Sequence, residues 1–149
     1  MAYTYDYPMP AVTTDCAIFN KKSRTVIDIL LIKRLKEPFK NYWALPGGFV
    51  EIDEELDDAA KRELFEETGI KHDELKQLFT VGTLGRDPRY RTISIIYYGY
   101  YDAETMIIKA GDDAIEAKWF PINCLPDLAF DHEKIIKSVL SCLKYYKSD

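Results

Sequence analysis

The pattern of apolar and polar residues predicts two neighbouring strands near the start of the chain. Residues 11–19 and 26–32 are apolar runs that favour β-structure, and the polar residues 20–24 between them are typical of a turn. Two strands joined by such a turn predict a hairpin. A further short apolar segment at 43–50 is broken by a Pro-Gly-Gly sequence.

After this breaker the apolar residues take up a different period. From Leu56 to Leu64 they recur at helical spacing, which predicts a helix over residues ~54–68. Asp53 is placed to cap the start of this helix, and Gly69 is placed to cap its end.

The second half of the chain predicts more strands and a closing helix. Residues 78–83, 92–101 and 114–120 are strand candidates, and Asp131 is placed to cap a final helix whose apolar residues recur at helical spacing. Strands around a central helix, closed by a second helix, indicate a mixed α/β fold with a sheet between helices. We expect one domain, 1–149.

Composition excludes several classes of protein. A formal net charge of −5 argues against broad, non-specific binding to nucleic acid. No apolar run reaches the roughly 18 residues of a membrane span, and the first residues lack the basic start and apolar stretch of a signal peptide. Cys16, Cys124 and Cys142 are far apart and form no CxxC pair, which indicates a reducing compartment. We therefore expect a cytoplasmic protein.

Three glutamates of the predicted central helix indicate where its chemistry lies. Glu63, Glu66 and Glu67 are spaced i, i+3 and i+4, so they share one face of a helix. Like charges at this spacing repel one another unless something neutralises them. A hard divalent cation with oxygen ligands is the candidate, although an acidic helix face is also common on solvated surfaces.

The segment around these glutamates resembles the signature box of the Nudix hydrolases. The defining positions of that box match at Gly48, Glu54, Arg62, Glu63, Leu64, Glu66, Glu67, Gly69 and Ile70. The resemblance implies an α/β/α sandwich with a mixed sheet, in which the box forms a loop, a helix and a second loop. It also implies an enzyme that uses water to cleave the diphosphate of a nucleoside diphosphate linked to a moiety X.

The resemblance further implies Mg²⁺ or Mn²⁺ as cofactor. The metal ligands of the family correspond to Glu63, Glu66 and Glu67, joined by the backbone carbonyl of Gly47. Arg62 corresponds to an arginine that pairs with a box glutamate and orients it. Such a site agrees with elementary chemistry, because cleavage of a diphosphate needs electrostatic stabilisation of phosphoryl oxygens and an activated water.

Two roles in this site have alternatives. Glu54 is either a direct metal ligand or the partner of an orienting salt bridge. The base that deprotonates the water is either a box glutamate or an acid from a later loop. Glu116 is our candidate for that later acid, with Asp112 and Asp113 as competitors; a surface charge on a strand is the structural alternative for Glu116.

Segments outside the box resemble a subgroup that contains ADP-ribose pyrophosphatases and NrtR-type regulators. They are the loop 85–91, the sequence Leu-Ala-Phe-Asp-His at 128–132, and residues 49–54, where Asp53 replaces the Gly of many Nudix boxes. A proline downstream of the box is associated with ADP-ribose hydrolysis in the family, and Pro88 is the candidate here. Pro88 is alternatively an ordinary turn former.

The candidate substrate-binding residues are those whose side chains suit the phosphates and the adenine of ADP-ribose. Arginine suits bidentate phosphate contacts, and aromatic rings suit contacts with adenine. Solvated arginines and core aromatic residues are the structural alternatives. We assign His132 to the start of the final helix rather than to catalysis. The candidates are Arg34, Arg86, Arg89 and Arg91 for phosphate, and Phe39 and Trp43 for adenine.

The leading hypothesis is therefore an Mg²⁺-dependent enzyme that converts ADP-ribose to AMP and ribose 5-phosphate. One alternative is another Nudix pyrophosphatase, such as a MutT-like enzyme acting on oxidised (d)NTPs. The other is a non-enzymatic ADP-ribose sensor, which the intact box and the short stretch after Ile136 disfavour. We expect a small-molecule nucleotide as partner, no nucleic acid and no membrane, and, from the resemblance alone, a homodimer.

Overall fold

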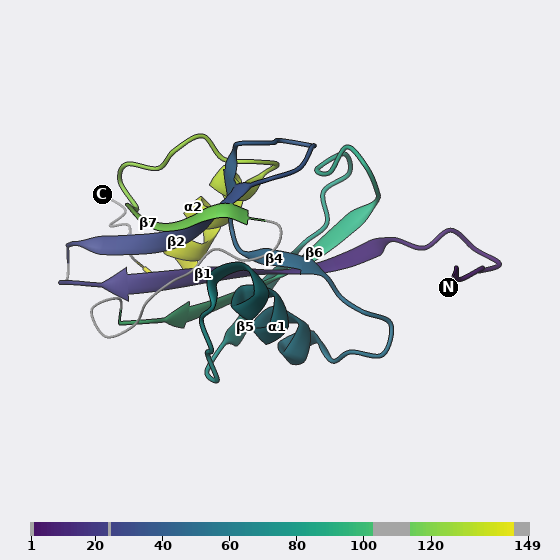
Figure 1. Ribbon diagram of the computed structural model, residues 1–149, viewed down its shortest axis with the longest axis horizontal. Coiled ribbons are helices and arrows are strands. Elements are labelled where there is room, and N and C mark those ends of the chain that lie inside the picture. Colours follow the sequence, from purple (N-terminus) through teal and green to yellow (C-terminus); the bar gives the residue numbers. More distant parts are fainter. Residues whose placement is uncertain (1, 24, 103–113, 145–149) are drawn as a thin grey trace.

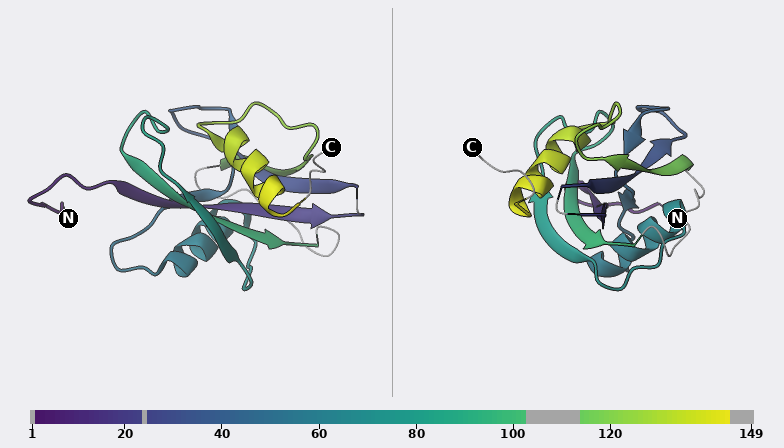
Figure 2. Two further views of the ribbon diagram at one scale, coloured as in Figure 1. Left: turned by 180° about the vertical axis from the view of Figure 1, so that it is seen from behind. Right: turned by 90° about the vertical axis from the view of Figure 1, so that its left-hand side faces the viewer.

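A mixed sheet lies between two helices in the computed structural model, which describes residues 2–23, 25–102 and 114–144 (Figure 1). Viewed from one end, α1 and α2 cover opposite faces of the sheet (Figure 2). This arrangement confirms the predicted α/β/α sandwich. The strands are β1 (Ala11–Lys21), β2 (Ile27–Arg34), β3 (Trp43–Ala44), β4 (Gly47–Phe49), β5 (Lys76–Val81), β6 (Thr92–Tyr100) and β7 (Ala114–Pro121), and the helices are α1 (Leu56–Thr68) and α2 (His132–Cys142).

Strand β1 organises the sheet because it pairs with three other strands. It pairs antiparallel with β2, which confirms the predicted hairpin, and parallel with β6 from Ala11 to Phe19. It also pairs antiparallel with the short strand β4, where Asp15 lies opposite Gly47. The Pro-Gly-Gly segment is therefore held against the middle of the sheet, directly before the helix that contains the glutamates.

Alternate residues of the central strands supply the cores on the two faces. Phe19, Ile29 and Leu31 pack with residues of α2, whereas Ile18 and Leu30 pack with residues of α1. This alternation follows from the period of two in a β-strand. A fully buried Leu or Ile contributes roughly 1.5–3 kcal/mol, so these contacts are the main attachment of both helices.

Two polar contacts also attach α1 to the sheet. The Tyr97 hydroxyl on β6 donates to Asp57 in the first turn of α1 at 2.6 Å, and Cys16 Sγ lies 3.7 Å from the carbonyl of Ala60. They fix the start and the middle of α1 relative to the strands that surround the site.

Several predicted boundaries need correction. The first helix has Glu55 rather than Asp53 at its N-cap position, and no side chain caps it. Gly69 ends it in the left-handed conformation, with φ of 76°, as predicted. Strand β5 begins two residues before the predicted 78, because residues 76 and 77 continue its pairing with β6. Asp131 does precede α2, but its side chain makes no cap and bonds elsewhere.

Within the described ranges, no helix has both the length and the apolar character needed to cross a membrane.

Candidate active site

A cavity of about 440 Å³ opens where the Pro-Gly-Gly turn, helix α1, the loop after β5 and the start of α2 meet. One part of its wall is acidic and another part is basic. The acidic residues include Asp15, Glu63 and Glu67, and the basic ones include Arg34, Arg62, Arg86 and Arg89. Phe49, Phe130 and His132 also lie on the wall.

Glu67 is the most enclosed of the three box glutamates, with 7% of its surface exposed. The backbone N–H of Gly47 donates to its Oε1 at 3.0 Å. This bond ties the turn before the helix to the second-last residue of α1, 20 positions later. Because Gly47 is held on its other side by β1, the carboxylate of Glu67 has a fixed position on the cavity wall.

Glu63 lies one helical turn before Glu67, directly against Gly48. A Cβ atom at position 48 would overlap the Glu63 carboxylate, so a side chain there would displace that carboxylate; the constraint is close approach and not a special φ. Burial raises the pKa of Glu63, and the hydrogen bond and charge of Arg62 oppose that rise. The wall therefore presents a partly desolvated carboxylate beside a guanidinium.

Arg62 explains how α1 tolerates its run of acidic residues. Its Nε and Nη2 donate to the two carboxylate oxygens of Glu54 at 2.6 and 2.9 Å, and its Nη1 donates to Glu63 at 2.7 Å and to Glu66 at 3.2 Å. The hydrogen bond from Arg62 lowers the pKa of Glu54. Of the two alternatives for Glu54, its geometry is that of an orienting salt bridge.

Glu66 differs from its neighbours in exposure. Its side chain is 44% exposed, it bonds to Arg62, and it is not part of the cavity wall. The three glutamates that share a helix face in the sequence thus have three environments: Glu67 is enclosed, Glu63 lies at the wall and Glu66 faces solvent.

Asp15 is a residue of this wall that our sequence analysis did not find. It lies on β1 opposite Gly47 and is 7% exposed. Burial raises its pKa to about 7, while the charge of Arg86 and a hydrogen bond with Ser94 oppose the rise. The sequence did contain a signal for Asp15, namely a carboxylate inside an apolar strand. Such a residue is rarely buried without a partner, so it marks a candidate site.

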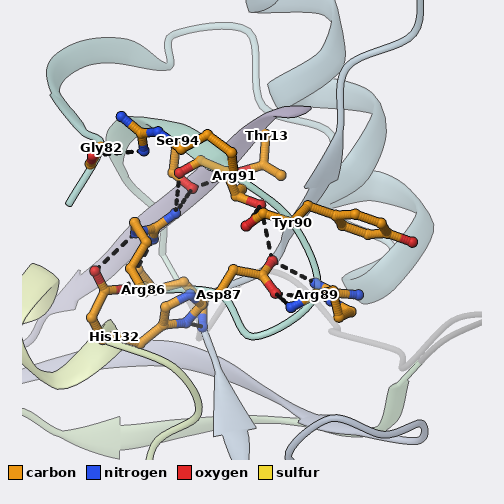
Figure 3. A network of polar contacts seen from close by, with 12 residues as sticks. Thr13, Gly82, Arg86, Asp87, Arg89, Tyr90, Arg91, Ser94 and His132 are labelled. Carbon is orange, nitrogen blue, oxygen red and sulfur yellow. Dashed lines mark hydrogen bonds and ion pairs between the residues drawn. The ribbon is translucent and has the colours of Figure 1, made fainter. Parts of the chain in front are cut away.

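Arg86 is bonded to protein groups on several sides (Figure 3). Its Nε and Nη2 donate to the two oxygens of Asp131, both at 2.9 Å, and its Nη1 donates to Ser94 at 2.6 Å. Only 5% of its side chain is exposed. Arg86 lies on the cavity wall as a rigid positive charge that joins the loop after β5 to the start of α2.

Arg89 sits nearer the rim of the cavity, where its side chain is 33% exposed. It makes a two-point ion pair with the buried Asp87, at 3.1 and 3.0 Å (Figure 3). Its guanidinium carbon lies 5.5 Å from the ring centre of Phe49 and 5.4 Å from that of Phe130. Such contacts hold a guanidinium in a cation–π arrangement.

Arg34 and Phe39 belong to the same end of the cavity. Arg34 lies on the wall, donates from Nε to the carbonyl of Pro38 at 2.9 Å, and stacks 4.9 Å from the ring centre of Phe130. Phe39 packs against Phe130 at 4.8 Å behind that wall. It therefore supports the wall and does not line it.

Three other candidates do not lie on the wall. Trp43 packs edge-on against Phe120 in the core beneath α2. Arg91 donates to the carbonyl of Gly82 at 2.7 Å, away from the cavity. Glu116 is exposed on β7, opposite Lys33 of β2. Each side chain is directed elsewhere by the strand or loop that holds it. The competing acids Asp112 and Asp113 lie outside the described residues.

His132 is the first residue of α2 and is 5% exposed. The backbone N–H of Leu45 donates to its Nδ1 at 3.0 Å. Burial lowers the pKa of His132 to about 4; Arg86 and Arg34 add to this effect and Asp131 opposes it. The imidazole is therefore neutral at pH 7, and its proton is on Nε2 because Nδ1 accepts a bond.

The donor chemistry of the wall fits a divalent cation. Among the residues described, no three His, Cys, Asp or Glu side chains already converge as ligands of one ion. Nevertheless Asp15, Glu63 and Glu67 present carboxylates to one cavity, and carboxylate oxygen is the ligand that Mg²⁺ and Mn²⁺ prefer.

Similarity to known proteins agrees with this geometry. The chain is 47% identical to the ADP-ribose pyrophosphatase of Methanocaldococcus jannaschii over 134 residues, which cover 90% of this chain and 75% of that protein. It is 36% identical over 146 residues to the ADPR responsive transcriptional repressor NtrR of Acinetobacter baylyi, covering 93% of this chain and 56% of the repressor. The chain thus spans little more than half of the repressor's length.

Solved structures give the same picture. The NUDIX domain of Shewanella oneidensis NrtR, complexed with ADP ribose, superposes with a TM-score of 0.84 at 28% identity, covering 93% of this chain and 94% of that one. A bifunctional NMN adenylyltransferase/ADP ribose pyrophosphatase from Francisella tularensis, complexed with AMP and a Mn ion, has a TM-score of 0.77 at 32% identity, covering 93% of this chain and 43% of that one. The model of the NUDIX domain matches residues 9–139, and the chain therefore belongs to the Nudix family.

Proposed function

We propose that this protein is a Nudix hydrolase that cleaves ADP-ribose to AMP and ribose 5-phosphate with the help of Mg²⁺ or Mn²⁺. One observation supports this proposal above the others: the box helix places Glu63 and Glu67 on the same cavity wall as Arg86 and Arg89. A metal-binding acidic patch beside fixed cations is the arrangement that diphosphate cleavage requires.

The roles of the residues follow from their contacts. Glu63 and Glu67 would hold the cation, with Gly47 and Asp15 as neighbours, and Glu66 would join them only by turning in from its present solvent-facing position. A cation bound there stabilises charge on the phosphoryl oxygens and lowers the pKa of a bound water. Arg62 positions Glu63 by its hydrogen bond, and Glu54 positions Arg62 in turn.

The base that receives the proton of the water is a box glutamate in this proposal. Glu67 is the candidate, because its position is fixed by Gly47 and it lies on the wall. Glu116 is exposed on β7 and is not part of the cavity wall, so it is a weaker candidate for the general base. General-base action needs a carboxylate within hydrogen-bonding reach of the water.

The identity of the substrate is supported by the named relatives and by the basic part of the wall. The relatives include the ADP-ribose pyrophosphatase of Methanocaldococcus jannaschii and the ADPR responsive transcriptional repressor NtrR of Acinetobacter baylyi. Arg34, Arg86 and Arg89 supply positive charge for the diphosphate that joins adenosine to the terminal ribose. A cytoplasmic location, a homodimer and a single domain over 1–149 stay predictions.

A substrate panel tests this function. The purified protein is incubated with ADP-ribose, ADP, an oxidised dNTP and Mg²⁺ or Mn²⁺, and the products are separated by chromatography. We expect AMP and ribose 5-phosphate from ADP-ribose, with a kcat/KM well above those of the other compounds. Absence of AMP would overturn the proposal. Faster release of diphosphate from the oxidised dNTP would favour the MutT-like alternative, and tight ADP-ribose binding without turnover would favour a sensor.

A further inference from the structure

His132 lies on the cavity wall, and one of its ring nitrogens is bonded while the other has no partner among the described residues. Nδ1 accepts from the N–H of Leu45, and no hydrogen bond from Nε2 to any described residue occurs. Nε2 is not sealed inside protein either, since the Thr14 hydroxyl is the single fully buried side-chain polar atom without a partner in the described part of the chain. Because His132 is part of the cavity wall, we take this nitrogen to face the cavity.

The hydrogen bond from Leu45 determines whether Nε2 is a donor or an acceptor. A nitrogen that accepts a hydrogen bond carries a lone pair, so the proton of the neutral ring is on Nε2. Nε2–H is consequently a donor and not an acceptor. His132 is only 5% exposed, and a donor on such a residue needs an oxygen partner, because a buried N–H without one is costly.

The same short segment limits the distance of His132 from the acidic part of the wall. The N–H of Leu45 donates to His132 Nδ1 at 3.0 Å, and the N–H of Gly47, two residues later, donates to Glu67 Oε1 at 3.0 Å. Two residues of extended chain span at most about 7 Å, so the two acceptor atoms lie within about 13 Å of each other. A diphosphate held at the glutamate carboxylates can therefore extend towards His132 along the same cavity wall.

The charges around His132 indicate which kind of oxygen it meets. Arg86 and Arg34 lie on the same cavity wall as His132, and both act electrostatically on the imidazole, as does Asp131, which is bonded to Arg86. A neutral donor on a wall that carries two arginines is suited to an anionic oxygen. We propose that His132 Nε2–H donates a hydrogen bond to an oxygen of the substrate's diphosphate and holds that diphosphate beside Glu67. This inference rests on the proposed function in taking a diphosphate substrate.

Two substitutions separate this role from a structural one. In H132N the amide oxygen takes the place of Nδ1 and still accepts from Leu45, but nothing replaces the donor. In H132Q the amide nitrogen reaches the place of Nε2 and restores the donor, while the acceptor for Leu45 is lost. Thermal unfolding of both variants shows whether each is folded before binding is compared.

Binding of ADP-ribose, ADP and adenosine is measured by calorimetry in EDTA, and kcat and KM for ADP-ribose are measured with Mg²⁺. A hydrogen bond to a charged group accounts for about 10- to 100-fold in affinity. We expect H132N to weaken ADP-ribose and ADP by that factor and to lower kcat/KM similarly, with adenosine unchanged. H132Q should stay within about threefold of wild type, since the donor is restored.

Equal affinities for wild type and H132N would overturn the inference. Equal weakening in H132N and H132Q would also overturn it, because restoring the donor would then not restore binding. The two proposals fail separately: if the wild type does not hydrolyse ADP-ribose, the proposed function fails, while the comparison of ADP with adenosine still decides the role of His132.

Discussion

Arg62 holds the carboxylate of Glu54 by two hydrogen bonds, from Nε at 2.6 Å and from Nη2 at 2.9 Å. With these bonds made, its remaining nitrogen points to Glu63 and Glu66, so one guanidinium serves three carboxylates. The repulsion expected among glutamates on one helix face is relieved in this way by a residue of the same helix. Glu67 is the exception among the three box glutamates. The described contacts of its carboxylate include the N–H of Gly47 and no bond from Arg62.

Replacing Glu67 by glutamine should remove nearly all turnover. The change keeps the shape and the bond from Gly47 but removes the negative charge from the cavity wall. We expect kcat to fall by at least about 100-fold, because the charge supports both the cation and the activated water. Rates of AMP formation measure the effect.

The matched control for this prediction is D58N, which removes one charge from an exposed position of the same helix. Its kcat should stay within about twofold of wild type, since surface changes away from a site are close to neutral. Comparable losses in E67Q and D58N would mean that the general acidity of α1, and not the position of Glu67, determines the rate.

Adding a single methyl group at Gly48 should impair metal use and leave the fold intact. The new Cβ overlaps the Glu63 carboxylate, which can rotate away because it is the end of a flexible side chain. We expect G48A to need about 10- to 100-fold more Mg²⁺ for half-maximal activity, as displaced ligands and their supports usually cost that much. A titration of activity with Mg²⁺ measures it.

G82A is the control for that substitution, because a Cβ at Gly82 meets no atom nearer than 3.7 Å. It should leave the Mg²⁺ requirement unchanged. Normal metal dependence in G48A, with an unchanged melting temperature, would show that Glu63 does not need its present position.

The pair of Arg86 with Asp131 should matter for stability. Asp131 is 19% exposed on its side chain and holds both Nε and Nη2 of the nearly buried arginine. In D131N the guanidinium loses its compensating charge, and we expect the free energy of unfolding to fall by about 2–3 kcal/mol. Urea denaturation at neutral pH gives this value.

Glu133 offers the comparison for D131N. It lies in the first turn of the same helix, and its ion pair with Lys137 is exposed, with side chains 67% and 64% accessible. E133Q should change the free energy of unfolding by no more than about 0.5 kcal/mol. If both variants lose the same small amount, the buried pair contributes no more than a surface pair.

The stability of the protein should decrease on acidification through His132. Its pKa in the folded protein is about 4, below the ordinary value of 6.5, because burial disfavours the charged ring. As the pH falls from 6.5 to about 4, the unfolded chain binds a proton that the folded chain does not, so stability is lost. Relative to H132N, the free energy of unfolding of the wild type should fall by about 3 kcal/mol over this pH range. Urea unfolding curves of both proteins at several pH values measure the difference, and parallel pH profiles would contradict the assignment.

Local signals in the sequence were sufficient for much of the fold. The helical period from Leu56 to Leu64, the left-handed cap at Gly69 and the hairpin of β1 with β2 depend on residues close together in the chain. The box spacing likewise lies within one helix and its preceding turn, so it predicted the family and the position of Glu63 and Glu67. Such features need little information about the rest of the molecule.

Contacts between distant parts of the chain could not be predicted in this way. Leu45 meets His132 across 87 positions, and Arg86 meets Asp131 across 45. Asp15 reaches the wall because β4 pairs with β1, and Trp43 and Arg91 leave it because their strand and loop direct them elsewhere. Strand pairing and register set which of these residues share a cavity, and a one-residue change of register would reverse every side chain. The sequence by itself thus determined the helix and its glutamates, whereas the tertiary structure decided which acids, arginines and histidine surround them.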